Sequence, residues 1–211
     1  MQSTAAKRIH IGSHRAQMPE SETRIPVSID EFFDFSEDCE YKVEYRNGEM
    51  ITMGRTTMTH EQLVMRIGYL LSALLDSLPE YTVYGSNTGL YLPGVVASYS
   101  PDVVVVKGEP EMIIHQRKRK AKLFTNPFMV VEVLSTGTKT YDFSEKLPDY
   151  QKISGLAYIV FVNQYHPAVH VFSRTTNPNV WLNTNIEDMD GVVYIGEWYL
   201  SMRDIYKKVF S

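Results

Sequence analysis

The chain has 211 residues, of which 44% are hydrophobic and 12% aromatic, so it can bury the core of one domain. A formal charge of −4 argues against a surface that is basic throughout, although it leaves room for a local basic groove of the kind that binds nucleic acid. The single cysteine excludes an internal disulfide, and the sequence has neither a run of about 18 apolar residues nor a secretory signal. We therefore expect a cytoplasmic protein without a membrane span.

The N-terminal quarter predicts an arm, a short helix and a hairpin. Residues 1–24 are polar and show no periodicity, so we expect a flexible arm before a single domain over residues 25–211. A serine cap predicts a helix over residues 29–35. Residues 41–53 carry an Asn-Gly dipeptide near their centre, which is the strongest short-range signal for a tight hairpin turn. This segment predicts an N-terminal β-hairpin extension of the main fold.

The clearest helix follows the hairpin. Thr59 and Gln62 fit a capping box, and Pro79 ends the apolar stripe. The apolar side chains that recur at helical spacing are Leu63, Val64, Ile67, Leu70, Leu71, Leu74, Leu75 and Leu78. A stripe of this breadth indicates a helix that packs against a sheet.

Two valine-rich segments, residues 101–106 and 129–134, predict the centre of that sheet, because both are apolar on both faces. The remaining patterns predict strands over residues 81–84, 89–92, 157–162, 168–172 and 192–195, and helices over residues 141–153 and 200–210. The predicted fold class is α/β, with a central mixed β-sheet flanked by helices.

Each central segment carries one carboxylate. Asp102 follows a proline at the start of the first segment, and Glu132 interrupts the second. A buried carboxylate costs free energy unless its charge is offset, and a divalent cation would offset it. If the two strands are neighbours, about 4.8 Å apart, both carboxylates can reach one cation. Lys146, further along the chain, could orient a water molecule or meet a phosphate as a point charge.

Taken singly, these residues also have ordinary structural interpretations. Asp102 can simply start a strand, and Lys146 can be a solvent-facing charge on a helix. Glu132 is harder to explain as surface, because valines and a leucine surround it. The combination favours hydrolysis of a phosphodiester with Mg²⁺ or Mn²⁺, since such a cation offsets phosphoryl charge and helps to activate water.

These residues belong to a longer pattern that resembles the Uma2 family of restriction-endonuclease-like proteins, within the PD-(D/E)xK nuclease superfamily. The resemblance spans residues 25–211, and the block from Glu132 to Tyr150 is its most specific part. It rests on Pro101-Asp102 with the valines that follow, Val131-Glu132-Val133-Leu134-Ser135-Thr136-Gly137-Thr138, Tyr141-Asp142, Glu145-Lys146-Leu147, Tyr150 and Gly155, with Glu44-Tyr45-Arg46-Asn47-Gly48-Glu49 upstream and Leu200-Ser201-Met202-Arg203-Asp204-Ile205-Tyr206 at the end.

The resemblance implies a restriction-endonuclease-like core in which Asp102 and Glu132 are metal-binding and catalytic carboxylates. It also implies that the backbone carbonyl of Val133 is a third protein ligand of the metal. In the superfamily the lysine usually lies two residues after the acid, where this chain has Leu134. Lys146 on the following helix would supply the amine instead.

Two further positions follow from the same resemblance. Glu44 resembles the additional acid that many such nucleases use in catalysis. The chain departs from the family pattern at Ile159 and Asn163, where the family commonly has a tryptophan and an aspartate. We assign this departure to packing and to a turn, not to chemistry.

Other polar residues have two interpretations each. His60, near the start of the long helix, could be an acid, a metal ligand or a structural residue. Ser135 and Thr138 could bind phosphate or cap the next helix. The basic residues that could contact a DNA backbone, or could only be solvated, are Arg117, Lys118, Arg119, Lys120 and Lys122.

The sequence thus predicts an Mg²⁺- or Mn²⁺-dependent endonuclease that acts on DNA, although it does not exclude RNA. A homodimer would suit the cutting of a duplex, which needs two sites. The alternative is a catalytically silent nuclease-like module, associated with mobile elements, that binds nucleic acid or a protein partner. Buried carboxylates disfavour that alternative, because binding alone does not require them.

Overall fold

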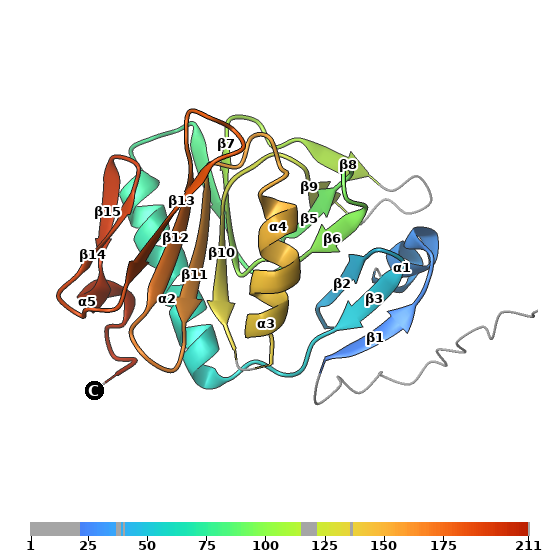
Figure 1. The fold of residues 1–211 in the computed structure, drawn as a ribbon, viewed down its shortest axis with the longest axis horizontal. Coiled ribbons are helices and arrows are strands. Elements are labelled where there is room, and N and C mark those ends of the chain that lie inside the picture. The colour runs from blue at the N-terminus through green and yellow to red at the C-terminus, as the bar shows by residue number, and fades with distance from the viewer. Residues whose placement is uncertain (1–21, 37–38, 40, 115–121, 136, 211) are drawn as a thin grey trace, which may run out of the picture.

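The computed structural model describes residues 22–36, 39, 41–114, 122–135 and 137–210. No described helix combines the length and the apolar character needed to cross a membrane. The described elements form a seven-stranded sheet, a six-stranded sheet with helices on both of its faces, and a small two-stranded hairpin (Figure 1).

A six-stranded mixed sheet carries the two central strands that the sequence predicts. Its order is β13 (Trp181–Ile186), β12 (Val169–Arg174), β11 (Tyr158–Asn163), β10 (Pro127–Leu134), β7 (Val103–Lys107) and β4 (Tyr81–Tyr84). Strands β10 and β11 run parallel, whereas the other neighbours run antiparallel. The α/β core with a mixed sheet is therefore confirmed, and β10 and β7 lie inside the sheet as their valines predict.

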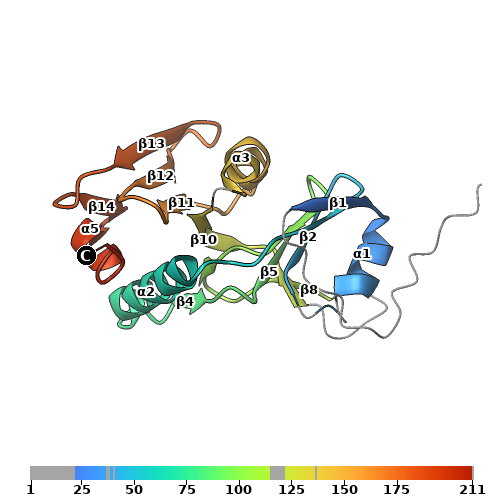
Figure 2. The same cartoon turned by 90° about the horizontal axis from the view of Figure 1, so that it is seen from below.

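Helices cover both faces of this sheet. Helix α2 (Met58–Leu75) packs on one face beside β14 (Val192–Ile195), β15 (Trp198–Ser201) and α5 (Met202–Ile205). A continuous helical segment covers the other face and consists of α3 (Lys139–Tyr141), the π-helix η1 (Asp142–Lys146) and α4 (Leu147–Tyr150). Figure 2 shows α2 and α3 on opposite sides of β10 and β11.

The pleat of β10 divides its side chains between the two faces. Val131 and Val133 pack in the core with α2, whereas Val130 and Leu134 pack in the core with the α3–η1–α4 segment. Since Glu132 alternates with Val131 and Val133, its side chain lies on the face that the π-helix covers.

The predicted hairpin is part of a second sheet. This seven-stranded sheet has the order β1 (Thr23–Pro26), β3 (Glu49–Thr52), β2 (Val43–Arg46), β6 (Ala97–Tyr99), β5 (Gly89–Leu92), β9 (Lys122–Phe124) and β8 (Met112–Ile114). Helix α1 (Ile29–Ser36) packs on it through Phe32 and Phe33. Asn47 and Gly48 both have positive φ, as a tight hairpin turn requires. Strand β1 includes two residues that the sequence places in the arm.

Two helices differ from the sequence prediction at their ends. The cap of α2 is Thr57, whose hydroxyl accepts a hydrogen bond from His60 N at 3.1 Å, so the predicted cap at Thr59 is wrong. The helix ends at Leu75, before the predicted stop at Pro79. The predicted closing helix over residues 200–210 shrinks to α5, because its first residues pair as β15 with β14.

Candidate active site

The two acidic residues of the central strands lie next to each other. Asp102 stands just before β7, and its backbone N–H donates to the carbonyl of Val131 on β10 at 3.1 Å. The carboxylate Oδ2 of Asp102 accepts a hydrogen bond from the N–H of Val133 at 2.9 Å. Asp102 therefore reaches across the residues that flank Glu132, and both carboxylates are buried, at 5% and 4% exposure.

Lys146 projects from the π-helix onto these acids. Its Nζ lies 3.1 Å from Glu132 Oε1, 2.9 Å from Glu44 Oε1 and 3.4 Å from Asp142 Oδ1. The lysine is buried, at 4% exposure. Three carboxylates thus share one ammonium group, and the sequence-based placement of the lysine on the next helix agrees with the geometry.

The lysine-bearing segment contains a π-turn and contacts both the acid cluster and the seven-stranded sheet. The N–H of Leu147 bonds to the carbonyl of Asp142, five residues earlier, which widens the turn by one residue. Lys146 and Tyr150 then both reach Glu132, and the Tyr150 hydroxyl donates to Glu132 Oε1 at 2.7 Å. Glu145 faces the seven-stranded sheet instead, where Arg46 donates to it at 3.1 Å. One face of the segment therefore builds the site while the adjacent face anchors it.

Glu44 enters from strand β2 and joins the same cluster. Its Oε1 accepts from the N–H of Ser100 at 2.9 Å, and its Oε2 accepts from the Tyr141 hydroxyl at 2.9 Å. Because Lys146 also contacts Oε1, Glu44 fixes the ammonium group between the two sheets. The extra acid that the family resemblance implies thus lies in the cluster, although its catalytic role stays a prediction.

Asp102 has two further partners that the sequence analysis did not assign to it. Lys42 Nζ lies 3.1 Å from Oδ1, and His60 Nε2 lies 3.1 Å from Oδ2. The Nδ1 atom of His60 is buried and has no hydrogen-bond partner among the described residues. Of the interpretations that the sequence left open for His60, the structure favours one in which it holds Asp102.

The charges of the cluster do not balance. Four buried carboxylates, Glu44, Asp102, Glu132 and Asp142, face the two ammonium groups of Lys42 and Lys146. Burial raises the pKa of Glu132 to about 8, against the attraction of Lys146, and burial also raises the pKa of Asp142. The site thus has more carboxylates than ammonium groups. Without a further cation, protonation of a carboxylate reduces this excess negative charge.

Asp102 and Lys146 keep their charges in this environment. Burial opposes ionisation of Asp102, but the hydrogen bond from His60 and the charge of Lys42 hold its pKa well below the ordinary value. Burial likewise opposes the ammonium form of Lys146, yet the carboxylates of Glu132, Glu44 and Asp142 raise its pKa well above the ordinary value. The cluster around Glu132 therefore contains a carboxylate and an ammonium group that both keep their charges.

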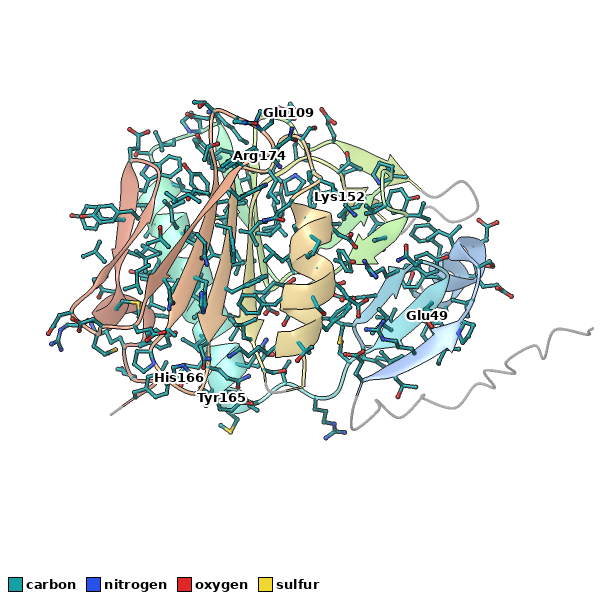
Figure 3. The ribbon with its side chains drawn as sticks, viewed as in Figure 1. Glu49, Glu109, Lys152, Tyr165, His166 and Arg174 are labelled. Atoms are coloured by element: carbon teal, nitrogen blue, oxygen red, sulfur yellow. The ribbon has the colours of Figure 1, made fainter. Side chains whose placement is uncertain are left out.

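A pocket of about 450 Å³ opens onto the cluster. Its lining includes the four carboxylates, both lysines and His60, together with Ser135, Thr138 and Tyr165. Figure 3 shows Tyr165 and His166 at one end of the six-stranded sheet and Glu109 at the opposite end. Ser135 and Thr138 hydrogen-bond to each other at 3.0 Å between their hydroxyl oxygens, so they also order the turn before α3.

The basic residues predicted to contact DNA are only partly described. Arg117, Lys118, Arg119 and Lys120 lie outside the described residues. Lys122 begins strand β9 in the seven-stranded sheet. Their contact with a DNA backbone therefore stays a prediction.

A fifth buried acid, Asp149, anchors the lysine-bearing segment. Asp149, at 1% exposure, accepts hydrogen bonds from Arg46 Nε at 2.8 Å, the Tyr99 hydroxyl at 2.7 Å and Lys152 Nζ at 3.0 Å. Lys152 is itself 60% exposed, so the buried partners Arg46 and Tyr99 carry most of the interaction. The segment is thereby joined to strands β2 and β6 of the other sheet.

We expect Asp149→Ala to lower the free energy of unfolding by about 3–5 kcal/mol, because Arg46 and the Tyr99 hydroxyl would lose a buried partner. Urea unfolding at neutral pH measures this loss. The control is Asp190→Ala, since Asp190 is 70% exposed and pairs with the exposed Arg203. Equal stabilities of the two variants would contradict an anchoring role for Asp149.

Taken together, the mixed sheet, the paired acids on adjacent strands and the lysine from the next helix define a restriction-endonuclease-like protein. A family model supports the same class: the Uma2 model, described as "Putative restriction endonuclease", matches residues 29–197. The match covers most of the chain, which therefore belongs to the Uma2 family.

Two cyanobacterial proteins and one solved structure are similar to the chain. "Uncharacterized protein sll1609" of Synechocystis sp. (strain ATCC 27184 / PCC 6803 / Kazusa) is 24% identical over 74% of this chain and 85% of its own length. "Uncharacterized protein slr1290" of the same strain is 26% identical over 78% of this chain and 82% of its own length.

A crystal structure described as a putative nuclease belonging to DUF820, from Anabaena variabilis ATCC 29413, has a TM-score of 0.70 at 16% identity. It covers 88% of this chain and 100% of its own. At that identity, the structural likeness shows a shared fold.

Proposed function

We propose that the protein is an Mg²⁺- or Mn²⁺-dependent endonuclease that hydrolyses DNA phosphodiesters. One observation carries the proposal: Lys146 lies 3.1 Å from Glu132, beside an Asp102 carboxylate that is bonded to the N–H of Val133. An acid pair on adjacent strands with a buried ammonium group beside it fits phosphoryl chemistry, because it combines cation ligands with a fixed positive charge.

The donor set fits a hard divalent cation. Asp102 and Glu132 offer carboxylate oxygens, and both hydrogen bonds that described residues make to Glu132 fall on Oε1. The N–H of Val133 points toward β7, and in a strand the carbonyl of the same residue points the same way. Since the ladder between β10 and β7 ends at Val131 and Val103, this carbonyl lies beyond the paired strands and suits a third ligand.

Among the described residues, no group of three or more His, Cys, Asp or Glu side chains is already gathered for a metal. Lys42 pairs with Asp102, and Lys146 pairs with Glu44, Glu132 and Asp142. The excess of carboxylates over ammonium groups would be neutralised by one divalent cation, which supports the fit on electrostatic grounds.

The proposed roles follow from these contacts. Asp102, Glu132 and the Val133 carbonyl would hold the cation, which when bound would offset phosphoryl charge and lower the pKa of a coordinated water. Lys146 keeps its proton and would position the attacking water or a phosphate oxygen. Glu44 holds Lys146 in place through the contact at 2.9 Å.

We expect the purified protein to cut DNA when Mg²⁺ or Mn²⁺ is present, and to lose at least about 100-fold of that activity in Asp102→Asn. Plasmid nicking and the cleavage of a labelled duplex measure the two rates. EDTA should abolish cleavage by the wild type. Cleavage of RNA but not DNA would show that the substrate is RNA. Binding of nucleic acid without cleavage would favour a catalytically silent module.

The quaternary structure is part of the same proposal. A symmetric homodimer would bring two sites to the two strands of a duplex. Sedimentation equilibrium of the protein with and without a DNA duplex tests this, and a monomer in both conditions would contradict it.

A further inference from the structure

Lys42 holds Asp102 from the side of the pocket and differs from Lys146 in its freedom to move. Its Nζ lies 3.1 Å from Asp102 Oδ1 and 3.5 Å from the carbonyl oxygen of Ser100. The Lys42 side chain is 29% exposed, whereas that of Lys146 is 5% exposed. Within the described part of the chain, Lys42 has one ion pair and access to solvent, while Lys146 lies inside a cluster of acids.

The two oxygens of Asp102 have different partners. Oδ2 accepts from the N–H of Val133 and from His60, which both belong to rigid elements. Among the described residues, Oδ1 is bonded to Lys42. Oδ1 is thus the oxygen that a cation can take without disturbing the backbone contact, and Lys42 is the group that it would displace.

A displaced Lys42 would remain at the pocket. The side chain is long and flexible, and Lys42 lines the same pocket as Asp102 and Glu132. A divalent cation at Oδ1 would repel the neighbouring ammonium group and drive it from the carboxylate. An ammonium group at the edge of a cation-loaded pocket is a binding point for a phosphate oxygen.

We propose that Lys42 is an exchangeable counter-ion of Asp102, which yields Oδ1 to a divalent cation and then binds a phosphate of the DNA backbone. The proposal rests on the proposed function, from which it takes the cation and the DNA. It assigns to Lys42 a substrate-binding role that exists only in the metal-loaded protein.

The first experiment measures the affinity for Mn²⁺ by titration calorimetry. We expect Lys42→Met to bind Mn²⁺ about fivefold more tightly than the wild type, because no ammonium group competes for Asp102. Lys107→Met is the control, since Lys107 ends β7 at the opposite end of the sheet, is exposed and lies over the ring of Tyr81. Unchanged or weaker Mn²⁺ affinity in Lys42→Met would overturn the proposal.

The second experiment measures the affinity for a DNA duplex against salt concentration, with and without Ca²⁺ as the oxygen-liganded cation. With Ca²⁺, Lys42→Met should reduce the slope of log affinity against log salt by about 0.9, the value for one phosphate contact. Without Ca²⁺ the slope should not change, because Lys42 is then paired with Asp102. Lys42→Arg should restore the slope.

The outcomes separate the two proposals. If the wild type binds no Mn²⁺, both the proposed function and the role of Lys42 fail. If the wild type binds Mn²⁺ but Lys42→Met changes neither metal affinity nor the Ca²⁺-dependent slope, only the role of Lys42 fails. An equal loss of slope with and without Ca²⁺ would show an ordinary surface contact and would also overturn the exchange.

Discussion

Lys146→Met is expected to lower the free energy of unfolding by about 3–5 kcal/mol and to abolish metal-dependent cleavage. The reason is that Glu44, Glu132 and Asp142 share the ammonium group of Lys146 at distances of 2.9 to 3.4 Å. Removing it would leave buried acids without their cation. For a chain of this size the loss corresponds to a fall of roughly 10 °C in Tm.

Added metal gives this variant a specific signature. A divalent cation can supply the charge that the lysine no longer provides, so Mn²⁺ should restore part of the lost stability while cleavage stays absent. Thermal melts with and without Mn²⁺, together with a plasmid assay, measure both effects. The matched control is Lys152→Met, whose ammonium group is 60% exposed and pairs with Asp149. A Lys146→Met variant as stable as this control would contradict the shared-cation arrangement.

The second large effect is expected for Glu132→Gln, which should abolish cleavage without a loss of stability at neutral pH. Glutamine keeps the shape of the side chain and can still accept the hydrogen bond from Tyr150. Burial raises the pKa of Glu132 to about 8, so a neutral amide at this position avoids the free-energy cost of a buried charge. The main consequence of the substitution is therefore the loss of a carboxylate ligand for the cation.

The stability of Glu132→Gln should also depend on pH differently from that of the wild type. The pKa of Glu132 is raised from 4.5 to about 8 in the folded chain, so its contribution to stability is full below the lower value, falls as the pH rises between the two values, and is lost above about 8. Glu132→Gln lacks this loss, so its stability relative to the wild type should increase over that range and level off above it. Urea unfolding between pH 5 and pH 9 would show this increase.

Metal-dependent stabilisation provides the independent check on Glu132. Mn²⁺ at about 100 times its Kd should stabilise the wild type by about 2.7 kcal/mol, and it should stabilise Glu132→Gln much less. Glu109→Gln is the control, because Glu109 is exposed at the far end of the sheet (Figure 3). Equal stabilisation of all three proteins by Mn²⁺ would exclude Glu132 as a ligand.

Local signals predicted much of the fold. The Asn-Gly dipeptide fixed the β2–β3 turn because only a few residues accept positive φ at two successive positions. The valine runs predicted β7 and β10 because only central strands bury both faces. The prediction of the α2 cap was wrong. Thr56, Thr57 and Thr59 all offer a hydroxyl within one turn, and the sequence alone does not rank them.

Two of the strands that the sequence did not predict, β13 and β15, depend on distant partners. Strand β13 has mostly exposed residues and is held by its ladder with β12, so it lacks an apolar run. Strand β15 lies in a segment with helical spacing, but pairing with β14 decides its conformation. In both cases the tertiary environment outweighs the weak local preference.

The sequence by itself placed Asp102, Glu132 and Lys146 in one hypothesis, because a carboxylate among valines is costly and must be compensated. Only the tertiary structure decided which cations compensate them. Lys42 reaches Asp102 and Lys146 reaches Glu132 and Glu44, while the hydroxyls of Tyr141 and Tyr150 complete the cluster. These contacts join residues from two sheets and a π-turn, and no local pattern specifies them because electrostatic pairing depends on distance in space and not on spacing along the chain.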